Sequence, residues 1–186
     1  MSDSITVYVP RDAAAVSLGS DDVAELIAAA AEASEFEVQI VRNGSWGITW
    51  LEPLVEVSVD GQRIAYGPVA PDDVEGLVSA GLFEGGAHEL NLGPTADLDW
   101  LKNQDRWTFR RCGLIDPLSL ADYEANGGFA GLRKAFESGA EKVLETVKSS
   151  GLRGRGGAGF PTGIKWQTVA DADGEQKIHR VQCRRR

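Results

Sequence analysis

Residues 149–166 combine the residue types that bind anions and flat rings: Ser-Ser-Gly-Leu-Arg-Gly-Arg-Gly-Gly-Ala-Gly-Phe-Pro-Thr-Gly-Ile-Lys-Trp. Glycine has no Cβ, so a ligand can come close to the main chain, and successive amide N–H groups can point at one phosphate. Arg153, Arg155 and Lys165 add positive charge, and Phe160 adds a flat apolar surface. We therefore predict that this segment binds a planar ligand that carries phosphate.

Two other interpretations of the loop are weaker. A flexible linker is richer in serine and poorer in arginine and aromatic residues. An arginine-glycine segment that binds nucleic acid recurs in several copies within a basic chain, whereas this one occurs once in a chain of net charge -9. Gly154, Gly156 and Gly159 match G-x-G-x-x-G, but that dinucleotide fingerprint follows a strand, and residues 139–148 have helical apolar spacing. The sequence favours a flavin or nicotinamide site outside the ordinary Rossmann arrangement.

Two ordered motifs carry a family resemblance. Residues 151–166 resemble the signature of the FMN- and NADH-binding subunit of respiratory complex I and of its relatives in NAD-dependent formate dehydrogenases and NAD-reducing hydrogenases. The upstream residues 112–136 resemble the segment that precedes this signature in the family, so the resemblance covers roughly residues 110–177. It implies a protein that transfers hydride between NAD(H) and FMN and passes electrons to Fe–S clusters, with the cofactors supplying the chemistry.

The resemblance also implies which residues contact the cofactors. Arg155 and the backbone of residues 156–159 would lie close to the ligand, Phe160 would stack near the nicotinamide nucleotide, and Lys165 would approach the flavin. Hydride transfer needs no general acid or base, so we predict no catalytic residue in this chain. We also predict that the chain contributes no metal ligand. The complete predicted set of cofactor-binding residues is Gly154, Arg155, Gly156, Gly157, Ala158, Gly159, Phe160, Pro161, Thr162, Gly163 and Lys165.

Charge is divided unevenly along the chain. Residues 1–100 carry 3 arginines against 18 acidic residues, a charge of -15, whereas residues 101–186 carry 16 basic against 10 acidic residues, a charge of +6. An acidic first part argues against a nucleic-acid partner. No stretch has the apolar length of a membrane span and no secretion signal is visible, so we expect a cytoplasmic protein. Cys112 and Cys183 form neither a disulfide framework nor a complete metal site.

The first hundred residues predict a small α/β domain with the order β-α-β-β-β-α. Residues 5–9 are rich in β-branched residues and predict a strand, as does the alternation of residues 36–41. Between them, Ser20 is a candidate N-cap for a helix whose apolar stripe is Val23, Leu26, Ile27 and Ala30.

Strands at residues 54–59 and 62–66 flank Asp60-Gly61, a two-residue sequence that favours a tight hairpin. Pro71 then opens a short helix. This order resembles a thioredoxin-like ferredoxin domain.

Iron-binding members of that group hold a two-iron cluster with cysteine thiolates. The corresponding loop here, residues 42–50, contains no cysteine, so we predict no cluster in this domain. Trp46 and Trp50 in that loop are expected to line the core or a cleft rather than face a partner. A domain of this kind without cysteines resembles most the beta subunit of NAD-dependent formate dehydrogenase. The resemblance then implies a molybdenum catalytic subunit and a small Fe–S subunit as partners.

Three alternatives remain open: the diaphorase subunit of a hydrogenase, the complex I flavoprotein subunit, and a non-catalytic scaffold that docks other subunits. The predicted organisation is a thioredoxin-like domain at residues 1–100, a helical connector at 101–148 and the start of an FMN/NADH-binding domain at 149–177.

Residues 178–186 do not fit the family, whose members continue with Tyr-Ile-Val and Cys-Asn-Ala-Asp-Glu-Gly. A back-translation of the tail encodes Lys-Tyr-Ile-Val-Cys-Asn-Ala-Asp-Glu once a single base is removed after Lys177, so we infer a frameshift. The alternative is a basic tail for nucleic acid or anionic lipid. On the frameshift interpretation, the [4Fe-4S] cluster belongs to a missing C-terminal part, and the isolated chain is expected to be inactive because a loop without its supporting residues is poorly preorganised.

Overall fold

The structure, a computed structural model, describes residues 4–174 and divides the chain into two compact units, residues 1–127 and 128–186. The unit boundary therefore lies later than the predicted end of the first domain at residue 100. Residues 101–127 group with the first unit by their contacts, and the predicted division into domain, connector and FMN/NADH-binding segment stays a prediction. The predicted out-of-frame tail lies outside the described residues.

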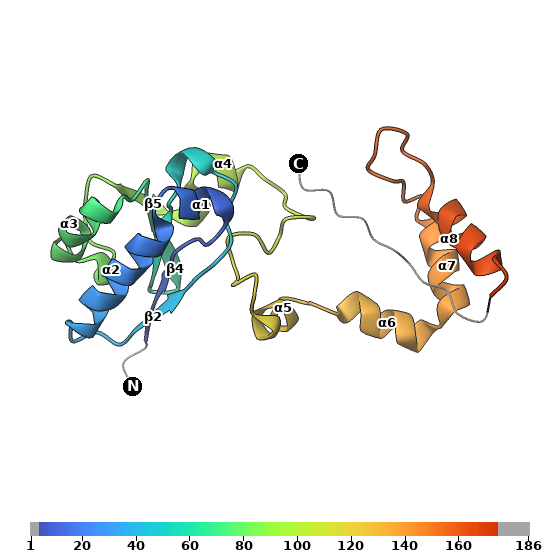
Figure 1. The fold of residues 1–186 in the computed structure, drawn as a ribbon, viewed down its shortest axis with the longest axis horizontal. Helices are drawn as coiled ribbons and strands as arrows, with labels where there is room; N and C mark the ends of the chain where they lie inside the picture. The colour runs from blue at the N-terminus through green and yellow to red at the C-terminus, as the bar shows by residue number, and fades with distance from the viewer. Residues whose placement is uncertain (1–3, 175–186) are drawn as a thin grey trace. The chain divides into compact units, whose positions relative to one another are not determined.

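The first unit is built on a five-stranded sheet with the order β2-β1-β3-β4-β5 (Figure 1). β1 pairs in parallel with β2, and the other neighbouring strands pair antiparallel. The strands are β1 (Ile5–Tyr8), β2 (Val38–Val41), β3 (Val55–Val59), β4 (Gln62–Tyr66) and β5 (Asn91–Pro94). The predicted α/β class, a sheet domain followed by helices, is confirmed.

Short helices connect these strands. The longest, α2, packs against β2 and against α3. The helices of this unit are α1 (Ala13–Ser17), α2 (Ser20–Glu32), α3 (Val74–Ser79), α4 (Asp99–Lys102) and α5 (Leu120–Ala125), with 3₁₀ turns at Thr49–Leu51, Pro71–Asp73, Leu82–Glu84 and Thr95–Asp97.

Side chains from β1, β3 and β4 and from α2 and α3 form one apolar core, and Val38 and Ile40 of β2 pack against it partly buried. Its buried members are Val7, Val9, Val23, Ala24, Ile27, Val55, Val57, Tyr66, Val69, Val74, Leu77, Leu82 and Phe83.

The start and the apolar face of α2 differ from the prediction. Gly19, in the left-handed conformation with φ 93°, is the N-cap, and Ser20 is the first helical residue. The Ser20 hydroxyl is buried and accepts a hydrogen bond from Arg42 at 3.5 Å, so it does not cap the helix. Val23 and Ile27 are buried as predicted, whereas Leu26 is 44% exposed and Ala24 takes its place in the core.

The predicted hairpin between β3 and β4 is confirmed. Asp60 and Gly61 both have positive φ, 49° and 77°, which is the geometry of a type I′ turn. The register places Val57 opposite Ile64, so the turn directs the apolar side chains of both strands to the core. The strand predicted at residues 36–41 begins only at Val38, and β5 was not predicted.

The second unit is helical in the described residues. It contains α6 (Ala130–Ser138), α7 (Ala140–Ser149) and α8 (Thr162–Asp171), and α7 packs against α8. The glycine-rich loop connects these two packed helices. The helix predicted from the apolar spacing of residues 139–148 is α7.

Candidate functional site

The glycine-rich loop folds into a narrow hairpin between α7 and α8. The amide of Thr162 donates to the carbonyl of Leu152 at 2.9 Å, and the amide of Gly154 donates to the carbonyl of Phe160 at 2.9 Å. These bonds close the base of the loop, so residues 155–159 form its tip. The tip is therefore held by the protein's own backbone rather than extended as a linker would be.

Arg153 holds the second half of the loop, at Gly159 and Pro161, against the first half. Arg153 Nε donates to the carbonyl of Gly159 at 2.6 Å, and Arg153 also forms a backbone bridge with Pro161. Arg155, two residues along the chain, is an exposed residue of the tip. Within the described residues the two arginines thus have different surroundings, one bound to the loop and one at its open end. Arg153 was not among the predicted site residues, although the Arg-Gly-Arg sequence contains it.

The glycines of the loop differ in what their backbone requires: Gly151 and Gly159 have positive φ, 64° and 52°, whereas Gly163, Gly156 and Gly157 do not. Gly163 is buried, and a Cβ there would lie 2.8 Å from the Cα of Lys148, so the close crossing of α7 and α8 requires glycine. Gly156 and Gly157, at the tip, have φ values open to other residues, and a Cβ on either would meet no atom within 4 Å. The fold of the described chain does not require glycine at these two positions, and each leaves room for another group to approach the backbone.

Phe160 and Lys165 lie next to the tip. The Phe160 ring is 44% exposed, and Lys165 Nζ lies 5.6 Å from its centroid. α8 begins just after Pro161, with no side-chain hydrogen bond from its N-cap residue. The first amides of a helix are partly positive and favour anions nearby. A flat ring and a cationic side chain thus lie close together, beside a loop tip with open backbone.

All eleven predicted residues lie in this hairpin or in the first turns of α8. The hairpin hydrogen bonds bring Gly154 to the backbone of Phe160, and Lys165 lies close to the Phe160 ring. Ala158 is exposed at the tip, and Gly163 serves the helix crossing. Their role in cofactor binding stays a prediction.

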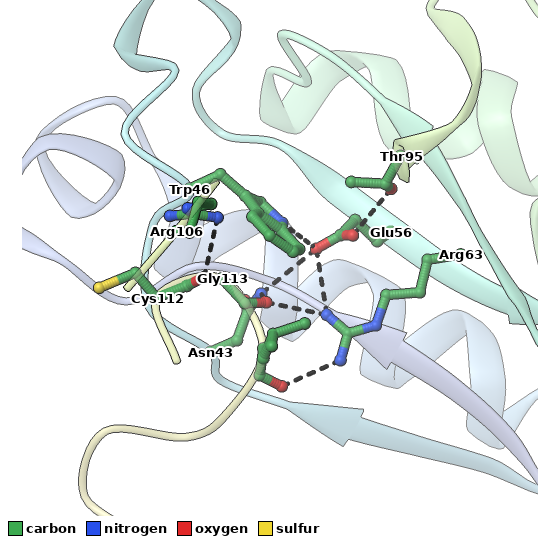
Figure 2. Close-up of polar contacts among 9 residues, drawn as sticks. Asn43, Trp46, Glu56, Arg63, Thr95, Arg106, Cys112 and Gly113 are labelled. Atoms are coloured by element: carbon green, nitrogen blue, oxygen red, sulfur yellow. Dashed lines mark hydrogen bonds and ion pairs between the residues drawn. The ribbon is translucent and has the colours of Figure 1, made fainter. Parts of the chain in front are cut away.

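The first unit holds a polar cluster that sequence reasoning missed (Figure 2). Glu56 in β3 is fully buried and accepts hydrogen bonds from Trp46 Nε1 at 2.8 Å and Thr95 Oγ1 at 2.8 Å. Asn43 Nδ2 lies 3.3 Å from the same carboxylate, and Arg63 forms an ion pair with it at 3.5 Å. The available signal was a glutamate inside a run of valines at residues 55–59.

Burial raises the pKa of the Glu56 carboxyl above its ordinary value of 4.5, while Arg63 and the hydrogen bonds from Trp46, Thr95 and Asn43 act to lower it. The effect of burial is the larger. The carboxylate holds structure together rather than transferring protons, because its oxygens are occupied by donors.

The two tryptophans of the 42–50 loop differ. Trp46 lines two cavities and donates to Glu56, as expected for a residue that lines a cleft. Trp50 is 59% exposed and stacks edge-on against Trp100 at 5.3 Å, so the expectation for Trp50 is wrong. Among residues 4–174, no three Asp, Glu, His or Cys side chains gather as metal ligands would. The prediction of no cluster in this loop stays a prediction.

Comparison with known proteins gives similarity to subunits of NAD(P)-linked oxidoreductases. No protein-family model matches the chain. It is 51% identical over 76 residues to the NADP-reducing hydrogenase subunit HndC of Solidesulfovibrio fructosivorans, which covers 41% of this chain and 16% of the relative. It is 56% identical over 69 residues to an NADH-quinone oxidoreductase subunit of Rhizobium meliloti, with 37% and 16% covered.

The corresponding NADH-quinone oxidoreductase subunit of Streptomyces coelicolor is 38% identical over 99 residues, covering 53% of this chain and 19% of the relative. The chain thus spans less than a fifth of each of these curated relatives. They support the predicted resemblance to subunits of NAD(P)-linked oxidoreductases. They do not show the more specific assignment to formate dehydrogenase.

Among solved structures, the chain is similar to a thioredoxin-like [2Fe-2S] ferredoxin from Aquifex aeolicus. The two are 21% identical with a TM-score of 0.43, over 50% of this chain and 94% of the ferredoxin. Separately, within residues 4–174, the helices are too short or too polar to cross a bilayer.

Proposed function

We propose that the second unit contributes part of an FMN and NADH site in a flavoprotein subunit of an NAD-dependent oxidoreductase. The observation that supports this most is the open backbone at Gly156 and Gly157, because glycine there is not needed by the fold. A phosphate or a flat ring approaching this backbone would use the missing Cβ atoms. The curated relatives, whose names include NADH-quinone oxidoreductase and NADP-reducing hydrogenase subunits, support the same class.

The residues present fit such a ligand. The exposed Arg155 supplies a cation at the tip, and the tip amides can donate to phosphate oxygens. The half-exposed ring of Phe160 offers a surface on which a planar ring can stack, with the Lys165 ammonium group close to it. Bound FMN would supply the hydride and single-electron chemistry, and these residues would hold it in place. The proposed role of the residues of this loop is to bind and orient the cofactor.

Within this class we propose the beta subunit of an NAD-dependent formate dehydrogenase, which would act with a molybdenum catalytic subunit and a small Fe–S subunit. The thioredoxin-like first unit with its cysteine-free loop supports this choice. The hydrogenase diaphorase subunit and the complex I flavoprotein subunit are the alternatives, and the names of the relatives favour them. Isolation of the assembled complex separates them: formate-dependent NADH formation supports the first, and hydrogen- or quinone-dependent turnover supports the others.

The loop assignment is tested with two single substitutions, Gly156→Ala and Gly157→Ala, and a matched control, Gly131→Ala. Gly131 lies in α6, and a Cβ there also meets no atom within 4 Å. All three variants should keep their thermal stability or gain about 0.4–1 kcal/mol, because alanine restricts the unfolded chain. Only the two loop variants should lose FMN affinity, measured by quenching of flavin fluorescence.

We expect the wild-type chain alone to bind FMN weakly and to show little NADH–ferricyanide activity. The matched segment is 16–19% of each relative's length, so most groups that would surround the cofactor lie elsewhere in such a subunit. Equal FMN binding by wild type and both loop variants would contradict the proposed contact. Substantial ferricyanide reduction by the purified chain would contradict the expected dependence on further residues.

A non-catalytic docking scaffold is a second candidate function. The exposed pair formed by Trp50 and Trp100 favours it, because exposed tryptophans are frequent at protein–protein contacts. Purification distinguishes the two: a yellow protein with bound FMN supports the cofactor site, and a colourless protein that captures another subunit supports the scaffold.

A further inference from the structure

Residues 112–116, here called the strap, lie along one side of the first unit and are held by side chains from the sheet and from the loop after β2. Asn43 Nδ2 and Arg63 Nη1 both donate to the carbonyl of Gly113, each at 2.8 Å, and Arg63 Nη2 donates to the carbonyl of Leu114 at 2.9 Å. Figure 2 shows the side chains of Asn43 and Arg63 meeting at Gly113. The strap is at least 50 residues beyond either donor in sequence, so this is a tertiary contact.

Two more contacts extend the attachment toward the end of the strap. The amide of Gly44 donates to the carbonyl of Ile115 at 3.2 Å, and Arg11 Nη1 lies 3.8 Å from the carboxylate of Asp116. Three successive backbone carbonyls of the strap are therefore bound by groups of the first hundred residues. The segment is a turn rather than a strand, and its carbonyls are bound one by one by groups of the first unit.

One position of the strap is restricted to glycine. Gly113 has φ +81°, and a Cβ added to it would lie 2.1 Å from Cδ2 of Trp46. The backbone of the strap thus lies directly on the indole ring, and any side chain at this position would displace it. The site, defined as Asn43, Gly44, Trp46 and Arg63, selects glycine at the position that contacts Trp46.

Glu56 contacts three of the four residues of this site. Its buried carboxylate accepts hydrogen bonds from Asn43 and from the Trp46 indole, and it pairs with Arg63. The side chains of three of the four site residues are therefore oriented by one group beneath them. A preorganised set of donors loses little entropy when a peptide binds.

We propose that Asn43, Gly44, Trp46 and Arg63 form a peptide-binding site. Its ligand is a turn with the sequence glycine, two aliphatic residues and an acidic residue, in which the glycine has positive φ as Gly113 does. In this chain the site is occupied by residues 113–116, and it can accept the same segment from a second polypeptide once its own strap is displaced. The site lies wholly in the first unit, and the proposal does not depend on FMN or NADH binding.

The direct test uses the full chain with Gly113→Val, in which the strap can no longer lie on Trp46, and a fluorescent peptide with the sequence of residues 110–118. Fluorescence anisotropy should show saturable binding to this variant. Wild type should show little, because its own strap competes at an effective concentration on the order of millimolar. A peptide with alanine in place of the glycine should not bind.

Adding Arg63→Gln to Gly113→Val should weaken peptide binding about tenfold or more, since hydrogen bonds from a charged group are lost. Lys102→Gln is the matched control, because Lys102 is exposed and pairs only with Asp99 among the described contacts. Equal binding of the alanine peptide, or undiminished binding after Arg63→Gln, would overturn the proposal. So would failure of the peptide to bind a Gly113→Val chain whose circular dichroism is that of wild type.

Hydrogen exchange tests the same site without Gly113→Val, in case that variant does not fold. In wild type the Gly44 amide, which donates to the strap, should be protected. Arg63→Gln should increase its exchange about tenfold or more while the amide of Val57 in β3 stays unchanged, which shows local release of the strap. Unchanged exchange at Gly44, or equal increases at Gly44 and Val57, would overturn the proposal.

Discussion

Glu56 shows how one buried charge can hold distant segments together. It sits in β3, where both neighbours, Val55 and Val57, are fully buried. Its hydrogen-bond partners come from the loop after β2 and from the turn after β5, and its ion-pair partner from β4. The sequence could not predict this cluster, because a lone glutamate among valines does not show which donors surround it. The Asp60-Gly61 turn needed only local geometry and was predicted.

Substitution of Glu56 should separate hydrogen bonding from charge. Glu56→Leu removes the acceptor of Trp46 and Thr95 and the ion-pair partner of Arg63, and should lower the free energy of unfolding by about 3–5 kcal/mol. Glu56→Gln keeps one acceptor oxygen and should cost less, about 1 kcal/mol. Urea unfolding followed by circular dichroism measures both values. A Leu variant as stable as the Gln variant would contradict the described network.

The raised pKa of Glu56 gives a pH dependence with a definite sign. The folded protein takes up a proton at a pH where the unfolded chain, with its ordinary pKa near 4.5, has not yet done so. This stabilising contribution is complete below the unfolded pKa and is lost as the pH rises through the folded one.

The unfolding free energy of wild type minus that of Glu56→Gln should therefore increase as the pH falls toward 4.5 and level off below it. Unfolding titrations of both proteins at several pH values measure this difference. If this difference decreased on acidification, Arg63 and the hydrogen bonds would lower the pKa of Glu56 by more than burial raises it.

Among the helices and loops, the glycine-rich loop depends on the crossing of α7 and α8. Gly163 of α8 lies against the backbone of Lys148 in α7, and the loop between them closes with its own backbone bonds. The helix α7 and the special backbone of the loop could be predicted from apolar spacing and glycine content. The distinct roles of the glycines could not, because only the packing shows which of them faces a helix and which faces open space.

Gly163→Ala tests this packing. A Cβ 2.8 Å from the Cα of Lys148 forces the two helices apart, which should cost about 1–3 kcal/mol. The loss is expected as a lower melting temperature of the second unit and faster hydrogen exchange in α7 and α8. Gly131→Ala in α6 is the control, and equal effects of the two substitutions would argue against a tight crossing.

The two units of the chain differ in their structural features. The first has a buried apolar core and a site occupied by its own strap, whereas the second has a loop with open backbone and exposed cations. The charge pattern of the sequence predicted an acidic first part and a different second part, and residues 101–127 group with the first unit by their contacts. The long-range bonds from Asn43 and Arg63 to the strap keep residues 112–116 with the first unit.

The proposed function depends above all on contact between FMN and the tip of the glycine-rich loop. This contact is measured by an equilibrium titration of the purified chain with FMN, followed by flavin fluorescence and repeated with Gly156→Val. We predict weak, saturable quenching by wild type that is lost in the variant, while circular dichroism stays the same. Saturable quenching of equal strength in both proteins, or none in wild type, would show that the tip does not bind the flavin.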